Sequence, residues 1–404
     1  CNLYLGGKEG TAIYYGKPVI YDSGGREHFM YPNEARLRNM TYACSIHYDV
    51  DIEMTIHSDG GKDEIIEQKL SKIFLGRFPI MLQSKLCILN GLARDVRFNM
   101  GECKNDPGGY FIVDGKEKVI ICQEKFADNT LYIRDKVNDI YSHAAEIRSV
   151  SEDASKPTRT LSVRIVAPTE TITNDNIVVN IPNVRKPIPL FIVMRALGVV
   201  SDKDIIKYCL LDLESNKDII DLFRPSIHDA GYIFTQAAAL KYISTFVKHA
   251  TSIPEVMQIL SIYFLPHIGE LNFKDKALFL GYMVRRLLAV YTKNSKPTNR
   301  DSYEYKRIEV SGMLLYQLFR EYYKMQFNNI KVKIQKEYFY HKPAYQNANF
   351  ANLIVNNIGG AKGLFTDRIV ESGFKKAFKG NWGAQAHTKR LGVVQDLSRL
   401  SYYG

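Results

Sequence analysis

The apolar pattern of this chain changes near residue 126, and this change constrains the fold more than any other feature of the sequence. From Asn2 to about Lys125 the apolar residues form short runs rich in Ile, Val and Tyr, separated by Gly and Asp. Such runs are typical of β-strands. A mixed α/β stretch follows, and then long helical patterns around residues 187–198, 231–249, 254–264 and 275–293. We therefore expect a multidomain α+β protein whose second domain begins near residue 126.

Two local patterns are especially clear. Asp114 and Gly115 separate the apolar run Tyr110–Val113 from the run Lys116–Cys122. An Asp-Gly pair suits the primed turns that join two antiparallel strands, so the sequence predicts a β-hairpin here. The stretch Ile308–Tyr340 is long, amphipathic and rich in aromatic residues, which fits one or two helices.

Length, composition and charge narrow the class of protein. With 404 residues the chain is long enough for two or three domains, each with its own apolar core. Its 46% hydrophobic and 24% charged residues argue against disordered, collagen-like and disulfide-scaffold classes. The formal net charge of +11 favours an acidic partner such as nucleic acid, because Lys and Arg neutralise phosphates and release counterions. A merely soluble basic protein is the alternative.

The cysteines and the apolar runs indicate a compartment. The six cysteines form no C-x-x-C pair, so we expect reduced, mostly buried thiols and a cytosolic or nuclear protein. No apolar run approaches the length of a membrane-spanning helix. The chain begins at Cys1 without a charged leader and an apolar core, so we expect no signal peptide and a missing N-terminal piece.

The last 32 residues, 373–404, are strongly basic, with six Lys or Arg against one acid. Apolar residues recur there every three positions, at Leu391, Val394, Leu397 and Leu400. We expect a helix that docks through this face and leaves Arg390 and Arg399 free for phosphates. A solvated basic face without a ligand is the alternative.

Two further features bear on nucleic-acid binding. Trp382, Tyr402 and Tyr403 are candidates for stacking on bases, although burial is the commoner fate of such rings. Residues 285–307 carry seven basic residues and two acids. This stretch is either a second stripe that faces phosphates or a set of cations paired within the fold.

No catalytic or metal-binding constellation is apparent. The sequence lacks the phosphate loop, Gly-x-Ser-x-Gly, H-E-x-x-H and a tight Asp cluster. His143 and Glu146 have the spacing of two ligands on one helix face, but no third ligand is near. The charge pattern Glu34–Asn39 predicts a helix with ion pairs inside the fold, and Asn33 is its candidate cap. We assign no catalytic residue and no metal ligand.

Several strings of the sequence resemble, in order, blocks of the second-largest subunit of eukaryotic-type multisubunit RNA polymerases, the counterpart of the bacterial β subunit. These strings are YPNEARLRNMTY at 31–42, GRFPIMLQSK at 76–85, DPGGYFIVDGKEK at 106–118, SHAAEIRS at 142–149, FLPHI at 264–268, FLGYM at 279–283, SGMLLYQLFR at 311–320 and GNWG at 380–383. The resemblance covers essentially the whole chain.

The resemblance implies a division into named domains. These are a β-rich protrusion over 1–125, an α/β lobe with a helical bundle portion over 126–300, a return to the protrusion over 301–361 and an incomplete fork over 362–404. In the family these domains line one side of the cleft that holds template DNA, the RNA–DNA hybrid and downstream duplex. Ala384 stands where the family has an acid and the loop 385–390 is shorter, so we expect strand separation to differ in detail.

The resemblance also implies site residues, by match to the fork motif. The nucleic-acid-binding positions are Arg390, Arg399, Lys389, Gln385 and Lys375. Their implied role is electrostatic positioning of phosphates, with no role as acid, base or nucleophile.

The implied activity belongs to a larger assembly. The resemblance implies a DNA-directed RNA polymerase, a nucleotidyltransferase whose Mg²⁺ is held chiefly by the largest subunit and not by this chain. Its implied partners are the largest and the other polymerase subunits, template DNA and the RNA–DNA hybrid, with no membrane. The implied location is the nucleus, or the virion or host cytoplasm for a large DNA virus. We expect the chain to stop inside the fork. The alternative is a stand-alone nucleic-acid-binding or scaffold module.

Overall fold

The computed structural model describes residues 1–21, 24–57, 63–152, 156, 158–169, 175–247, 252–345, 352–358, 363–386 and 388–401. The chain divides into two compact units. Unit 1 comprises Cys1–Glu124 and Ile308–Gly404, and unit 2 comprises Lys125–Arg307. The expected multidomain α+β class is confirmed.

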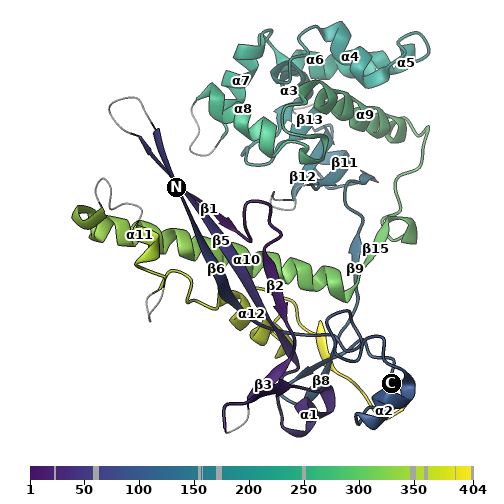
Figure 1. The fold of residues 1–404 in the computed structure, drawn as a ribbon. Helices are drawn as coiled ribbons and strands as arrows, with labels where there is room; N and C mark the ends of the chain where they lie inside the picture. The colour runs from purple at the N-terminus through teal and green to yellow at the C-terminus, as the bar shows by residue number, and fades with distance from the viewer. Residues whose placement is uncertain are drawn as a thin grey trace. The chain divides into compact units, whose positions relative to one another are not determined.

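A long antiparallel hairpin dominates unit 1 (Figure 1). Its strands are β5 (Ala43–His57) and β6 (Asp63–Pro79), and β1 (Asn2–Leu5) and β2 (Ile13–Gly16) pair with the other edge of β5. Alternate β5 residues, among them Val50, Ile52 and Met54, are buried. This alternation follows from the two-residue period of a strand with one covered face.

Smaller elements complete the first part of unit 1. They are β3 (Val19–Tyr21), β4 (Glu27–Phe29), α1 (Pro32–Leu37), α2 (Arg94–Asn99), β7 (Phe111–Val113) and β8 (Lys116–Ile120). The expected hairpin at Asp114-Gly115 is confirmed, because β7 and β8 pair around it and its φ angles are +50° and +76°. Positive φ at both positions is what a type I′ two-residue turn requires.

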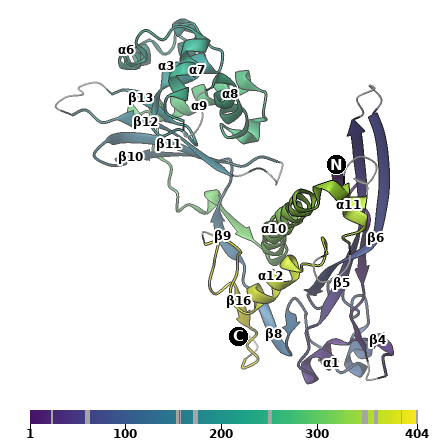
Figure 2. The same cartoon turned by 90° about the vertical axis from the view of Figure 1, so that its left-hand side faces the viewer.

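Two helices from the C-terminal part of the chain cover the sheet of unit 1 (Figure 2). The stretch expected to be helical after Ile308 is one 30-residue helix, α10 (Ser311–Tyr340). It packs against α12 (Ile369–Phe378), and α11 (Asn352–Val355) lies between them in sequence. Phe374 of α12 makes an edge contact with Phe78 of β6 at 5.1 Å between ring centroids. This contact joins the C-terminal helices to the N-terminal sheet in one core.

Unit 2 combines an antiparallel sheet with a helical layer. The strands pair in sequence order: β10 (Leu131–Asp135), β11 (Tyr141–Ser149), β12 (Arg159–Val166), β13 (Ile177–Asn180) and β14 (Ile188–Pro189). The helices are α3 (Leu190–Ala196), α4 (Asp202–Leu210), α5 (Lys217–Ile220), α6 (Arg224–Ala230), α7 (Gln236–Ser244), α8 (Ile253–Ile262) and α9 (Phe273–Tyr291). The four expected helical stretches are confirmed. Strand β9 (Gln123–Phe126) pairs with β15 (Lys306–Glu309) in a two-stranded sheet.

Some local expectations are wrong. Helix α1 begins at Pro32 after Tyr31, so Asn33 lies inside the helix and is not its cap. His143 and Glu146 lie on strand β11, where an odd spacing places side chains on opposite faces. The six cysteines are free thiols, but Cys1, Cys103 and Cys122 are exposed. In the described part of the chain, no helix is long and apolar enough to cross a membrane.

Candidate nucleic-acid interface

The basic C-terminal segment adds a strand to the β7–β8 hairpin. Strand β16 (Val394–Asp396) runs antiparallel to β8, with Val394 opposite Ile120. The Leu397 N–H donates a hydrogen bond of 3.0 Å to the Glu117 carbonyl oxygen and extends this pairing. The segment therefore obtains its hydrogen bonds from a strand that lies far earlier in the sequence.

The expected docking helix at residues 391–400 is wrong. Leu391 and Leu400 are 89% and 96% exposed, whereas Val393, outside the three-residue pattern, is 1% exposed. The open edge of β8 favours an extended segment there, and a strand buries residues with a different period from a helix. Tyr402 and Tyr403 lie outside the described residues.

A tight loop connects α12 to the basic segment. Trp382 is 5% exposed, so it is a core residue and not a base-stacking platform. Its carbonyl oxygen accepts a hydrogen bond of 2.9 Å from the Arg390 N–H. The Glu321 carboxylate of α10 accepts hydrogen bonds from the Ala384 and Gln385 N–H groups, at 3.1 Å and 3.2 Å. A carboxylate that accepts from two backbone N–H groups fixes the loop on the helix.

Gly383 allows this loop to close. Its φ is +97°, and a Cβ added there would lie 2.3 Å from the Thr388 carbonyl oxygen. In a Gly383→Ala variant the positive φ alone should cost about 1–3 kcal/mol of stability as backbone strain. The overlap of the new Cβ with Thr388 should add to this cost and open the loop. Hydrogen exchange of the Arg390 amide should then accelerate. Gly380→Ala is the matched control, because Gly380 has a φ of +105° with open space around it. Equal acceleration in both variants would contradict a role for the close contact.

Arg390 is partly engaged within unit 1. Its Nη1 lies 3.2 Å from Glu309 Oε2, and the side chains of Arg390 and Glu309 are 43% and 4% exposed. The Gln317 amide of α10 donates to the same carboxylate at 2.7 Å. The buried Glu309 therefore holds one nitrogen of Arg390. The rest of the guanidinium is half-exposed and can donate outward, because Arg has five N–H donors.

Arg399 is more fully engaged. Its Nε and Nη2 each donate to the Glu117 carboxylate at 2.8 Å, and Nη2 also donates to the Tyr110 hydroxyl at 3.2 Å. Arg36 of α1 donates to the same Glu117 at 2.9 Å. Burial alone would raise the pKa of Glu117, but the hydrogen bond and charge of Arg399, together with Arg36, lower it. Arg399 thus anchors the segment to the hairpin.

The other three predicted residues differ in their surroundings. Lys375 on α12 lies 3.4 Å from Glu371 Oε1, one helical turn earlier. Lys389 and Gln385 have exposed side chains, and within the described residues Lys389 forms no ion pair. The structure brings Gln385, Lys389 and Arg390 together on one loop. It places Arg399 on the β8 side and Lys375 on α12.

Sequence reasoning missed the acids that hold these cations. Glu117, Glu309 and Glu321 lie far from residues 385–399 along the chain, and each contacts the segment only through the tertiary fold. No local pattern marks them. Within the described residues, no group of three His, Cys, Asp or Glu side chains could hold a metal ion.

The second basic stretch, residues 285–307, also contains both exposed cations and cations engaged within the fold. Arg285 and Arg286 are exposed on α9, and no ion pair involves them within the described residues. The Arg300 guanidinium instead lies over the rings of Phe126 and Tyr132, at 5.2 Å and 5.1 Å from their centroids. A phosphate-facing role for this stretch remains a prediction.

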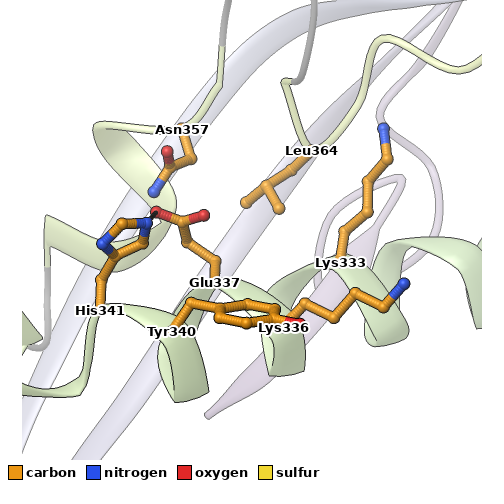
Figure 3. A pocket seen from close by; sticks show the side chains of 7 residues that line it. All are labelled: Lys333, Lys336, Glu337, Tyr340, His341, Asn357 and Leu364. Carbon is orange, nitrogen blue, oxygen red and sulfur yellow. Dashed lines mark ion pairs between the residues drawn. The ribbon is translucent and has the colours of Figure 1, made fainter.

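A pocket of about 410 Å³ lies beside the C-terminal half of α10, away from the basic loop (Figure 3). Glu337 and His341, four residues apart at the end of α10, point toward each other, with His341 Nε2 3.8 Å from Glu337 Oε1. Lys333 is held by the Asp367 carboxylate at 2.8 Å. The pocket lining thus contains the acid Glu337, whereas the exposed cations of the basic loop lie beside no unpaired acid within the described part of the chain, so the basic loop is the stronger candidate for phosphate binding.

Comparison with known proteins decides the family. Residues 9–357 match the family described as RNA polymerase beta subunit. The chain belongs to the RNA polymerase beta subunit family. Among its relatives, the DNA-directed RNA polymerase II subunit RPB2 of Encephalitozoon cuniculi is 37% identical over 96% of this chain and 33% of that protein.

More distant relatives extend this likeness. The DNA-directed RNA polymerase III subunit RPC2 of Schizosaccharomyces pombe is 31% identical over 96% of this chain and 32% of that protein. The DNA-directed RNA polymerase subunit Rpo2 of Saccharolobus solfataricus is 32% identical over 80% of this chain and 28% of that protein. The family resemblance expected from the ordered strings is confirmed. The chain spans about a third of the length of these curated relatives.

Proposed function

We propose that this chain is part of the second-largest subunit of a DNA-directed RNA polymerase and lines the cleft that holds DNA and the RNA–DNA hybrid. The observation that carries the proposal is the 37% identity to a polymerase II subunit over 96% of the chain. The net charge of +11 is consistent with a polyanionic ligand. The chain takes part in template-directed RNA synthesis as one piece of a nucleotidyltransferase assembly.

The loop that carries Gln385, Lys389 and Arg390 is the proposed contact with the phosphate backbone. Glu321 and Glu309 hold its backbone and one side of Arg390, while the Lys389 ammonium is exposed. A cation held on a rigid loop binds phosphate with less loss of conformational freedom than one on a mobile tail. The role is electrostatic positioning, because phosphate contacts set register and orientation without reading sequence. Arg399 on the β8 side and Lys375 on α12 are proposed as separate cationic contacts.

The remaining parts of the function lie outside this chain. We propose that the largest subunit holds the catalytic Mg²⁺ and that this subunit assembles with it and with the other polymerase subunits. A nuclear location follows for an enzyme like the eukaryotic relatives. No observation favours the alternative of a stand-alone module.

The phosphate contact can be tested with the salt dependence of binding. Lys389→Ala combined with Arg390→Gln should weaken binding of a short RNA–DNA hybrid to the chain. It should also lower the slope of log affinity against log salt by about 0.7–0.9 for each lost phosphate contact. Fluorescence anisotropy over a salt series measures both quantities. Gln at 390 retains an amide donor for the buried Glu309.

The matched control changes an exposed cation elsewhere. Lys203 on α4 of unit 2 is exposed, and within the described residues no ion pair involves it. Lys203→Ala should leave both the affinity and the slope unchanged. If the loop variant keeps the slope of the unaltered chain, the loop does not contact phosphate and the assignment fails.

A further inference from the structure

The outward face of α10 carries an ordered stripe of side chains with no role in the nucleic-acid loop. The inward face is a row spaced by four residues, Leu314, Leu318, Tyr322, Gln326 and Ile330, and all five are buried. At 100° per residue, the opposite side of the helix comprises a second row. This second row, here named the open stripe, consists of Met313, Tyr316, Arg320, Lys324, Phe327 and Lys331, which are all exposed.

The open stripe has a single sign of charge. Arg320, Lys324 and Lys331 form no ion pair within the described residues, and the stripe contains no acid. Other cations of unit 1 are paired with acids, as Lys333 is with Asp367 at 2.8 Å. The stripe therefore presents three uncompensated positive charges along the helix. Such a row attracts a partner that carries negative charge at similar intervals.

The open stripe also exposes apolar side chains among the charges. Met313, Tyr316 and Phe327 are 45%, 55% and 43% exposed. Exposed apolar side chains do not stabilise a helix face that only contacts water, because apolar area in water costs free energy. Met, aromatic residues and Arg are the side chains enriched in protein–protein interfaces. Their repetition at helical spacing favours a binding surface.

We propose that the open stripe docks an acidic amphipathic helix of a partner protein. The stripe spans 19 positions, with a rise of about 27 Å along the helix, which a partner helix of similar length can follow. Leu or Phe side chains of the partner pack against Met313, Tyr316 and Phe327, and its Asp or Glu side chains pair with the three cations. A duplex nucleic acid, whose bases are stacked inside, would satisfy only the cations, and the apolar members favour a protein. The inference is independent of the role of the 385–390 loop.

The experiment measures binding of a designed peptide to the whole chain. The probe is a fluorescent helix of about 18 residues with Leu along one face and Glu flanking it. A peptide of the same composition in scrambled order keeps the charge and loses the apolar face. Duplex DNA is the third probe. Two variants divide the open stripe: Arg320→Glu with Lys324→Glu removes its charge, and Met313→Ser with Phe327→Ser removes its apolar part.

We expect peptide binding to require both the charged and the apolar side chains of the open stripe. Each double variant should weaken binding of the amphipathic peptide by at least about tenfold, and the scrambled peptide should bind at least about tenfold more weakly. Lys203→Glu with Lys217→Glu is the matched control, since both residues are exposed in unit 2 and the charge change is the same. This control should leave binding unchanged.

Other outcomes overturn the proposal. Equal binding of the two peptides, or no effect of the apolar variant, would show a purely electrostatic surface. Tighter, stripe-dependent binding of duplex DNA would assign the stripe to nucleic acid. Absence of peptide binding would leave α10 with a solvated face. Because the altered side chains are exposed, the variants should keep their fold, and the circular dichroism of each variant checks this.

Discussion

Replacement of Lys276 by Met should destabilise unit 2 by about 3 kcal/mol, one of the two largest effects that we expect from a single change in this chain. Lys276 on α9 is fully buried. Its ammonium donates to the carbonyl oxygens of Leu260 and Ser261, at 2.8 Å and 2.7 Å, and to that of Glu270 at 3.3 Å. Met fills a similar volume but has no donor, so the three carbonyl groups lose this partner.

Two effects oppose each other in this substitution. Removal of the ammonium abolishes the free-energy cost of burying a charge. The pKa of Lys276 is lowered from 10.5 to about 8, which corresponds to a cost of roughly 3 kcal/mol. Loss of hydrogen bonds leaves three buried carbonyl groups, at about 1–3 kcal/mol each. The second effect is larger. Lys274→Met, an exposed change on the same helix, should alter stability by less than about 0.5 kcal/mol.

Amide hydrogen exchange in α8 and α9 is the suitable measurement. The only Trp of the chain, Trp382, lies in unit 1, so Trp fluorescence reports the other unit. Exchange of the slowest amides in α8 and α9 reports the opening free energy of unit 2 itself. Equal exchange in Lys276→Met and Lys274→Met would contradict the role assigned to the buried ammonium.

The pH dependence of the same residue has a definite sign. Burial lowers the pKa of Lys276 to about 8, below its ordinary value of 10.5. Between these values the unfolded chain binds the proton more strongly than the folded chain does, so this group makes stability rise with pH. The stability difference between the unaltered chain and Lys276→Met should therefore grow from about pH 8 toward pH 10. A difference that stays constant over this range would show that the folded-state pKa is not lowered.

The sequence predicted what is encoded locally. The Asp114-Gly115 turn and α10 follow from residue type and period over a few neighbouring positions, and the structure has both. Helix α9 appears within two residues of the expected bounds, because its apolar period continues over five turns. The resemblance of the ordered strings to the polymerase family does not depend on local structure. The family match over residues 9–357 confirms this resemblance.

Features that depend on distant partners were not predictable. The period of Leu391, Val394, Leu397 and Leu400 suits a helix, yet β8, more than 270 residues earlier, pairs with this stretch as a strand. The Arg399–Glu117 pair is 282 residues apart in sequence. Net charge could locate the basic segment, but it could not show which cations the fold already pairs. Only the tertiary contacts distinguish the exposed Lys389 from the anchored Arg399.

Arg36→Met should lower the free energy of unfolding of unit 1 by about 3–5 kcal/mol, because it leaves carboxylates without their partner in a buried network. The Arg36 guanidinium lies 2.9 Å from both Glu102 and Glu117, whose side chains are 4% and 16% exposed. It also donates to the Tyr110 hydroxyl at 2.6 Å. Met matches the length of the aliphatic stem and provides no donor.

Urea unfolding followed by Trp382 fluorescence measures this effect, since Trp382 is buried in unit 1. Arg38→Met is the control, because Arg38, the residue that follows α1, is 54% exposed and pairs with Glu34 four residues earlier. It should cost less than about 1 kcal/mol. Adding Glu102→Gln to Arg36→Met should restore part of the loss, since it removes an unpaired buried charge. A loss as small as that of the control would show that the network contributes little.

The same network couples the core of unit 1 to the basic segment. Glu117 accepts from both Arg36 and Arg399, so it is the shared acid between α1 and residue 399. The two arginines keep the pKa of Glu117 below its ordinary value of 4.5, so the stability from this ionised group is lost as pH falls through that lowered pKa. A double-mutant cycle between Arg36→Met and Arg399→Met should therefore show a coupling energy of at least about 0.5 kcal/mol at neutral pH. It should decrease in the Glu117→Gln background, because the shared charge is gone and the Tyr110 hydroxyl still accepts from both arginines.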